Sequence, residues 1–474
     1  MATKIAGAKA ALPAFKEGKG AGVRKFDINS NENKGETVSI VNGVVVFQYY
    51  ESLLQDSVRS TVSFTDTGDS VNGKSVMEGL PIYGTEKVSL KIEDNNDGVL
   101  ESVLHINKPT QLLDDTRKSL VQLSLASKEF FDNEKVRVIT RMDGKISESI
   151  RKILTKDDKG GQQYLNTEKK VDIEDTSNNR NFQGGNKKPF YTINWLARGA
   201  VPSSNASAPK NSAGFLFWET ADGFNFKSID WLMSTDTNPV KKKYIFNETS
   251  DMGGCDIPDG YDGKALDYSV ENKVDVQNKL KLGAYSTKLI TFNPFDQYYS
   301  TSFPNAKVNQ AIASSNEEGS QDKLKLGGKK LPVLSEEFNK EEGKEFSRTT
   351  FYVLDTGSLP EGTGTGEEQQ QLKKSKEENN KVGEVLNQGI MRLNQLFAMQ
   401  TTLTIPGDFT LRAGDAIYVD APARVKDSKS DAVDKQTGGN YVIANLCHYI
   451  DAKNTLTRLD LIRDSFGRKP MQRG

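Results

Sequence analysis

The side chains that most often do chemistry in proteins are scarce in this chain. Its 474 residues include only two histidines, His105 and His448, and two cysteines, Cys255 and Cys447. Most metal sites, and nearly all Ser-His or Cys-His catalysis, need more such groups than this. Cys447 and His448 are neighbours in a strand-like stretch, where successive side chains point to opposite faces. We therefore predict no catalytic residue, no metal site and no cofactor, and we expect Cys447 to be a buried free thiol.

Two other patterns bear on catalysis. Gly362, Gly364 and Gly366 match a phosphate-binding loop weakly, because no strand precedes them and no Gly-Lys-Ser/Thr follows. We interpret these glycines as part of a linker. The chain also lacks a Gly-x-Ser-x-Gly nucleophile motif. Any two of its 64 acidic residues can converge in space, which leaves a carboxylate-based hydrolase open as an alternative.

The composition indicates a multidomain protein with no general affinity for nucleic acid. The length allows about two to four domains. Lys plus Arg (63) nearly balance Asp plus Glu (64), so the net charge is -1 and no basic field attracts phosphates. The cysteine count fits a reducing cytoplasm and excludes a disulfide scaffold. Without an apolar run of about 18 residues, no signal peptide or membrane-spanning helix is expected.

Residues 391–474 are predicted to form a small antiparallel β-barrel or sandwich. Apolar and polar residues alternate up to a Pro-Gly turn and a Gly-Asp turn, and two further strands follow. Leu446 has the opposite parity from Ile443, so burying both requires a β-bulge or two buried faces. The expected core residues of this unit are Tyr441, Ile443, Leu446, Leu459, Leu461 and Phe466.

Four segments precede this unit. Residues 1–35 are predicted to be a flexible arm, because their first thirty or so residues are rich in Gly, Ala and Lys. Residues 36–112 show the alternation of a first β unit. A mixed α+β region is predicted for 113–302, and a linker or insertion with a helix for 303–390, where Glu, Lys, Gly, Gln and Asn dominate. The fold class is therefore multidomain α+β.

Local signals place elements within the last two of these segments. Ser147 is expected to cap a helix that buries Ile150, Ile153 and Leu154. Phe215–Phe226 is predicted to be a hairpin that turns at Ala221–Gly223. The helix towards the end of the charged segment carries an apolar stripe at three and four spacing, which either docks on its own domain or makes a trimer contact. That stripe comprises Val382, Val385, Leu386, Ile390, Leu393, Leu396 and Phe397.

Several short motifs occur in a characteristic order. Near the C-terminus they are Gly414–Ile417, Gly439–Ile443, His448 and Arg463–Ser465, and earlier they are Tyr50–Leu53, Leu80–Glu86 and the Phe-Trp-Glu-Thr-x-Asp-Gly-Phe series of the hairpin. In this respect the chain resembles the baseplate central hub proteins of contractile-tailed, T-even-like bacteriophages. These are related to the hub part of type VI secretion spike proteins. The charged segment and the insertion at Lys426–Lys435 depart from the family pattern.

The resemblance implies a structural role and no enzymatic activity. It implies a homotrimer in which each subunit supplies two barrel-like tube domains, 36–112 and 391–474. The resulting ring would join the sixfold tail tube to the threefold central spike and form part of the channel for the genome. The implied partners are the spike protein, tail tube or tube-initiator proteins and baseplate wedge proteins, with DNA passing only transiently. The implied location is the virion, after synthesis in the host bacterial cytoplasm.

Two other classes of function stay open at the level of sequence. One is a receptor- or glycan-binding module, for which the aromatic hairpin Phe215–Phe226 is suitable. The other is the tail-associated hydrolase noted above. Mass in solution discriminates among them, because a hub assembles as a threefold ring, alone or with its spike, and a receptor module need not.

Overall fold

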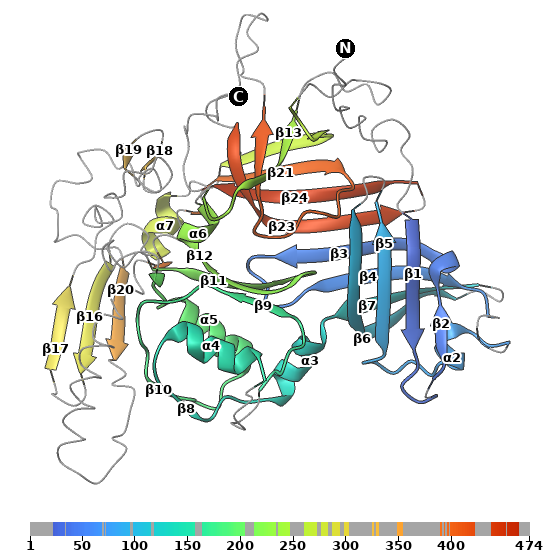
Figure 1. Ribbon diagram of the computed structural model, residues 1–474, viewed down its shortest axis with the longest axis horizontal. Coiled ribbons are helices and arrows are strands. Elements are labelled where there is room, and N and C mark those ends of the chain that lie inside the picture. Colours follow the sequence, from blue (N-terminus) through green and yellow to red (C-terminus); the bar gives the residue numbers. More distant parts are fainter. Residues whose placement is uncertain are drawn as a thin grey trace, which may run out of the picture.

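A computed structural model describes most of the chain (Figure 1). The described residues are 22–33, 35–68, 71, 73–94, 98–114, 118–156, 164–203, 213–233, 236–246, 260–272, 276–282, 287–293, 298–302, 325–326, 329–330, 348–353, 389–390, 393, 396–397, 399–421, 438–451 and 453–463. None of the helices in this described part has the length and apolar content needed to cross a bilayer.

The first unit is an antiparallel sheet in the order β3-β4-β7-β6-β5-β1-β2. It also includes η1 (Val41–Gly43) and α2 (Val76–Gly79). In β4 the buried residues alternate with partly exposed ones, as a half-buried strand requires. The strands are β1 (Gly22–Asn29), β2 (Thr37–Ser39), β3 (Val44–Ser52), β4 (Arg59–Asp66), β5 (Lys87–Glu93), β6 (Val99–Asp114) and β7 (Ser119–Ala126).

The predicted arm is wrong in its second half. Gly22–Asn29 forms β1, which pairs with β5 along its whole length. Phe26 and Ile28 of β1 are fully buried in the core of the first unit. Burial of these two side chains stabilises the strand, and the Gly/Ala/Lys composition of the segment does not reveal it. Residues 1–21 of the arm lie outside the described residues.

The middle unit packs helices on a small sheet with the order β11-β12-β9. The hairpin turns where predicted, between Thr220 and Gly223. Ser147 does not cap its helix, because the helix begins at Ile146 and the cap residue is Lys145. Instead, the Ser147 side chain bonds the Thr176 backbone within the core. The elements are α3 (Lys128–Lys135), β8 (Arg141–Met142), α4 (Ile146–Leu154), β9 (Lys170–Ile173), β10 (Phe182–Gln183), α5 (Pro189–Ala197), β11 (Phe215–Thr220), β12 (Gly223–Ser228) and α6 (Ile229–Met233).

The second β unit combines C-terminal strands with strands from residues 240–272. β13 pairs in parallel with β22, and β15 pairs antiparallel with β21. Strand pairing therefore crosses the segment boundaries drawn from the sequence. The strands are β13 (Val240–Ile245), β14 (Gly263–Lys264), β15 (Asp267–Asn272), β21 (Met399–Pro406), β22 (Ala416–Asp420), β23 (Gly439–Asp451) and β24 (Thr455–Arg463).

The predicted core of this C-terminal unit is confirmed where it is described. The register of β23 against β24 shifts between Ile443 and Asn445, which is the irregularity that the parity of Leu446 required. Phe466 lies outside the described residues. Tyr441, Ile443, Leu446, Leu459 and Leu461 are all at most 1% exposed and belong to one cluster.

One long strand joins the two β units into a single sheet. At one end of β23, residues from Gly439 to Val442 pair with β22. Further along the same strand, Asn445–Asp451 pair with β3. The strands of the two β units thus form one 14-stranded sheet. The expectation of two separate closed barrels is therefore wrong, and the described part of the chain is mostly β-sheet with few helices. The reason is that β3 offers a free edge that β23 is long enough to cover.

A smaller sheet lies on the left of Figure 1, and its Tyr352 hydroxyl accepts a hydrogen bond from Arg180 of the middle unit at 3.1 Å. Its order is β17-β16-β20, and its β20 falls within the segment predicted to be a charged linker. Of the apolar stripe in that segment, Leu396 is buried beside Trp218, while Val382, Val385 and Leu386 lie outside the described residues. The remaining elements are α7 (Val276–Leu282), β16 (Thr287–Asn293), β17 (Tyr298–Ser302), β18 (Lys325–Leu326), β19 (Lys329–Lys330) and β20 (Arg348–Val353).

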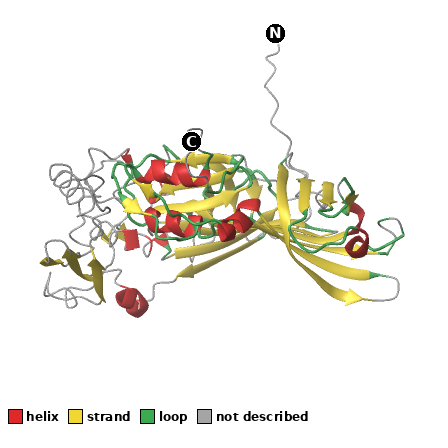
Figure 2. Cartoon of the chain, turned by 90° about the horizontal axis from the view of Figure 1, so that it is seen from below, coloured by secondary structure: helices red, strands yellow, loops and turns green. Residues whose placement is uncertain are grey.

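Seen from below, the elements form a long, flattened body (Figure 2). The first unit occupies one end of the long axis, and the middle and second units lie together towards the other end. The contact between the three units therefore falls in the middle of the molecule.

Candidate functional site

Glu51, at the end of β3, binds the other two units at once. Its Oε1 accepts a hydrogen bond from the backbone N–H of Ala221 (2.7 Å), and its Oε2 accepts one from Ala413 (2.9 Å). Oε1 also accepts the Tyr49 hydroxyl at 3.1 Å. Glu51 is 2% exposed, so these donors replace water as partners of the buried carboxyl group. We refer to Glu51, Trp218, Ala221, Ala413 and Gly414 as the three-unit junction.

Trp218 fills the centre of the junction from the β11 side. It is 2% exposed, and its indole Nε1 donates to the carbonyl of Ala413 at 3.0 Å. Leu53 of the first unit and Val442 of the second pack in the same apolar cluster as this ring. The Trp218 side chain thus has a hydrogen-bond partner for its indole N–H and packs with residues of both β units, and it fixes the position of the hairpin against the sheet.

Gly414 turns the chain beneath this indole. Its φ is +95°, and a Cβ placed there would lie 2.7 Å from Cζ2 of Trp218. Glycine is required both for the backbone conformation and for the close approach of the ring. The Gly-Asp turn therefore has a backbone conformation that residues with a Cβ resist.

A buried ion cluster supports the junction from the middle unit. Lys169 Nζ lies 2.8 Å from Glu129 Oε2 and 2.5 Å from Glu219 Oε1. Glu219 also accepts the backbone N–H of Val58 in the first unit at 2.9 Å. Burial raises the pKa of Glu219. Burial acts in the same direction on Glu129, but the charge of Lys169 together with hydrogen bonds from Lys169 and Thr167 lowers the pKa of Glu129. The side chains of these two glutamates are 1% and 5% exposed, so no substrate reaches them as a carboxylate pair.

Arg412 extends the junction towards the surface. Its guanidinium donates to the carbonyls of Phe409 (2.6 Å) and Leu411 (2.9 Å), and its Nε lies 3.2 Å from Asp222 Oδ2. Burial raises the pKa of Glu51 to about 7, against the opposing effect of the Arg412 charge. Glu51 is therefore the group at the junction that titrates near neutral pH.

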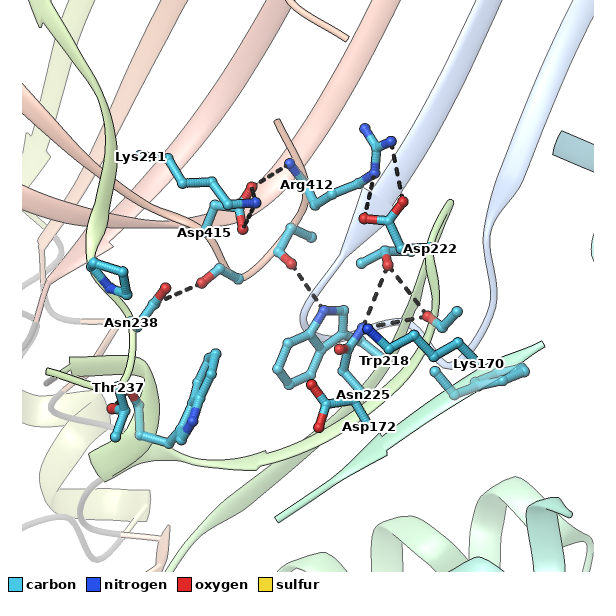
Figure 3. A pocket seen from close by; sticks show the side chains of 17 residues that line it. Lys170, Asp172, Trp218, Asp222, Asn225, Thr237, Asn238, Lys241, Arg412 and Asp415 are labelled. Carbon is cyan, nitrogen blue, oxygen red and sulfur yellow. Dashed lines mark hydrogen bonds and ion pairs between the residues drawn. The ribbon is translucent and has the colours of Figure 1, made fainter. Parts of the chain in front are cut away.

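A pocket of about 270 Å³ opens beside these residues (Figure 3). We call it the hairpin pocket, because the β11–β12 hairpin forms one wall and the turn at Gly414 another. Its charged groups are paired as Arg412 with Asp222, Lys241 with Asp415, and Asp172 with the neighbouring Lys227. Lys170 is the one ionisable lining residue that makes no ion pair within the described part of the chain. The indoles of Trp218 and Trp231 also line the pocket.

The two histidines lie on different strands of the described structure. His448 is fully buried on β23, where its Nδ1 contacts Thr457 Oγ1 at 2.9 Å and its ring lies 4.8 Å from that of Phe409. Burial lowers the pKa of His448 to about 3 and raises that of Cys447 to about 11. His105 lies on β6 against Phe131, several strands away.

Cys447 is a free thiol, as expected, but it is only partly buried. Cys255 lies outside the described residues, as do Gly362, Gly364 and Gly366. Within the ranges that the structure describes, no three His, Cys, Asp or Glu side chains gather as metal ligands would.

The four phenylalanines of the hairpin are buried, whereas its Trp218 also lines the hairpin pocket. Phe215, Phe217, Phe224 and Phe226 are each at most 3% exposed and pack in the core of the middle unit. Stacked pairs such as Phe217 and Phe224, with ring centroids 5.6 Å apart, fill the space beneath α4 and α5. Their alternation reflects core packing rather than a sugar-binding face.

Three of the sequence motifs converge at the junction. Tyr50–Leu53 supplies Glu51, the hairpin series supplies Trp218 and Glu219, and Gly414–Ile417 supplies the turn. Arg463, from a fourth motif, is buried and donates to the Gly438 carbonyl at 3.0 Å, while Asp464 and Ser465 lie outside the described residues. The sequence analysis did not identify Lys169 or Arg412. Only Arg412 had a signal in the sequence, namely its position next to the Gly-Asp turn.

Comparison with known proteins finds likeness only among solved structures. No protein-family model and no curated protein matches the chain. A tail protein from Neisseria meningitidis MC58 is 10% identical with a TM-score of 0.47, over 94% of this chain and 97% of that one. The 43 kDa tail protein of prophage MuSo2 from Shewanella oneidensis is 9% identical with a TM-score of 0.45, over 93% and 98%.

A third neighbour belongs to a secretion system. It is an E. coli component of the type VI secretion system, described as structurally similar to the T4 tail proteins gp27 and gp5. It is 7% identical with a TM-score of 0.40, over 95% of this chain and 79% of that one. The structural neighbours of the chain are thus phage tail proteins and type VI secretion proteins.

Proposed function

We propose that the chain is the structural baseplate hub of a contractile phage tail. In this proposal three copies form a ring that joins the sixfold tail tube to the threefold central spike and surrounds part of the genome channel. Its partners are the spike protein, the tail tube or tube-initiator proteins and the baseplate wedge proteins. The protein is made in the host bacterial cytoplasm and resides in the virion.

The observation that carries the proposal is the convergence of three family-like motifs on the three-unit junction. Residues that catalyse a reaction need access to a substrate, whereas Glu51, Trp218 and Gly414 are buried and bind other parts of the same chain. Their role is to hold two β units and a mixed unit as one stiff body. A ring that transmits force during contraction needs that property.

The continuous sheet supports the same role. β23 pairs with β3 by seven residue pairs, Asn445 with Ser52 through Asp451 with Val46, so the two β units cannot rotate freely about a linker. Two β units held at a fixed angle in each of three copies place six units around one axis. A closed cyclic assembly of this kind presents six similar units to one partner and three identical subunits to another.

Electron microscopy of the purified protein, alone and with its spike protein, tests the proposal. We expect threefold rings with a central channel, and light scattering that gives the mass of a trimer. A stable monomer at micromolar concentration that forms no ring after the spike protein is added would show that the proposed function is wrong.

A further inference from the structure

The turn before β5 presents one exposed aromatic side chain in a fixed position. Tyr83 is 78% exposed, although its neighbours Ile82 and Leu80 are buried in the core of the first unit. The buried Glu86 carboxylate accepts the backbone N–H groups of Tyr83 and Gly84, both at 2.9 Å. An exposed tyrosine on an immobilised backbone is typical of residues that contribute strongly to an interface.

The backbone of this turn is held in an uncommon conformation. Thr85 has a φ of +69°, which β-branched residues rarely adopt, and its N–H bonds the Ile106 carbonyl at 2.6 Å. Asn31 Nδ2 lies 3.3 Å from the Gly84 carbonyl oxygen and 3.2 Å from Thr85 Oγ1. Strained backbone persists where the surroundings determine it, and it is common at functional positions. Folding already orders the backbone at Tyr83, so binding through this side chain costs less conformational entropy.

The hairpin pocket has the size and chemistry to receive such a side chain. Its volume of about 270 Å³ lies below the usual range of pockets for drug-sized ligands and suits a single aromatic side chain. The indoles of Trp218 and Trp231 provide an apolar wall. The ammonium of Lys170, which makes no ion pair with another described residue, suits the face of a tyrosine ring. The Asp222 carboxylate and the Asn225 amide oxygen can accept the phenol O–H.

Tyr83 and the pocket lie in different parts of the body. The turn follows α2, at the end of the long axis occupied by the first unit, whereas β12, β13 and α6 surround the pocket in the other half (Figures 1 and 2). A threefold ring requires two different surfaces on each subunit, one for each neighbour. A projecting side chain at one end and a recess in the other half meet this requirement.

We propose that Tyr83 of one copy inserts into the hairpin pocket of the next copy. This inference rests on the proposed ring and identifies the two surfaces that close it. The occupant of the pocket is thus a second copy of this chain rather than a soluble ligand.

Photo-crosslinking of the full chain tests the contact directly. We would place p-benzoylphenylalanine at position 83 and, as a matched control, at Tyr191, which is also exposed (57%). Irradiation of the assembled protein should link copies only from position 83, with the links mapping by mass spectrometry to residues 218–231 or 412–415. Trimers whose links from position 83 map elsewhere would overturn this inference and leave the proposed ring intact, whereas a monomer would remove both.

Two variants provide a second test that does not depend on the probe. Tyr83→Ala should raise the concentration needed for half-assembly by about tenfold or more, and Tyr83→Phe by less, because the ring is retained. Lys170→Trp should obstruct the pocket without removing any ion pair. Mixed in equal amounts, the Tyr83→Ala and Lys170→Trp proteins retain one intact contact per pair, so dimers of one copy of each should form. Trimers in either pure variant at wild-type concentrations would contradict the proposal.

Discussion

The Glu51 carboxylate and the Ala413 backbone N–H are joined by a 2.9 Å hydrogen bond across 362 residues of sequence. The other oxygen of the same carboxylate accepts the N–H of Ala221 and the hydroxyl of Tyr49. One side chain therefore closes the contact of three units that the sequence separates widely. The stability of the body should depend on it more than on any surface group.

Replacing Glu51 by glutamine tests this dependence. At pH 5 the carboxyl group is protonated, because its pKa is about 7; each of its oxygens still has a lone pair for one backbone N–H, and its proton can be donated to the Tyr49 hydroxyl. The NH₂ group of glutamine cannot accept and would set its own hydrogens against a backbone N–H. We expect a loss of about 1–3 kcal/mol in the free energy of unfolding at pH 5, measured by urea denaturation. Glu101→Gln, at an exposed position on β6, serves as the control and should change little.

The pH dependence of that loss has a definite sign. The folded pKa of Glu51, about 7, lies above the ordinary value of 4.5, so the folded state keeps a proton that the unfolded state has released. Wild-type stability therefore falls through this group as pH rises from 4.5 to 7. The difference between wild type and Glu51→Gln should shrink over the same interval. A difference that stays constant or grows with pH would mean that the pKa of the buried carboxyl group is not raised.

His448 should act in the opposite direction. Burial lowers its pKa to about 3 from 6.5, so the folded state binds fewer protons than the unfolded state between these values. Stability through His448 is then lost as pH falls below 6.5, by about 1.4 kcal/mol per pH unit at most. Compared with His448→Gln, the wild type should lose its advantage between pH 6.5 and 4 in urea titrations. The half-buried His105, substituted in the same way, should give a shallower slope.

Gly414→Ala should destabilise the protein by two separable effects. The positive φ costs about 1–2 kcal/mol for a residue with a Cβ, and the approach of 2.7 Å to Trp218 adds about 1–3 kcal/mol of overpacking. Gly68 also has a positive φ, +79°, but nothing lies within 4 Å of its Cβ position, so Gly68→Ala isolates the first effect. Equal losses in the two variants, measured by thermal unfolding, would contradict the packing argument.

The core of the second β unit should be equally sensitive. Ile443 and Leu461 are fully buried and pair across β23 and β24. Truncating either side chain to alanine should cost about 2–5 kcal/mol in urea denaturation and should reduce ring assembly. Leu54→Ala, at a position that is 62% exposed, is the matched control and should cost less than 1 kcal/mol, roughly the limit for a surface change. Full thermal stability in the Ile443 variant would show that the core is misplaced.

A test for hydrolase activity completes the set. Glu129 and Glu219 are two buried carboxylates that both contact Lys169 beside the junction. We expect the purified protein to release no sugar or peptide from peptidoglycan. Turnover that disappears in Glu219→Gln, while the variant remains folded by circular dichroism, would overturn the structural role.

Much of the local structure could be predicted from the sequence. Tyr441, Ile443, Leu459 and Leu461 follow the two-residue period of a half-buried strand, and each is buried as expected. The Asp-Gly pair placed the turn of the hairpin at Thr220–Gly223, because a tight turn selects these residues. Leu446 has the opposite parity from Ile443, which required a β-bulge or two buried faces, and the register of β23 against β24 shifts between Ile443 and Asn445.

The partners of these elements were decided only in the tertiary structure. An alternating pattern records which face of a strand is buried, but its backbone edges are the same for every sequence, so it does not specify the neighbouring strand. For that reason β3 and β23 were assigned to separate barrels, although they pair directly. Likewise Glu51, which follows the aromatic stretch Phe47–Tyr50, gives no sign in the sequence of the two N–H groups that bind it. Hydrogen-bond partners distant in sequence exist only after folding brings Ala221 and Ala413 to the end of β3.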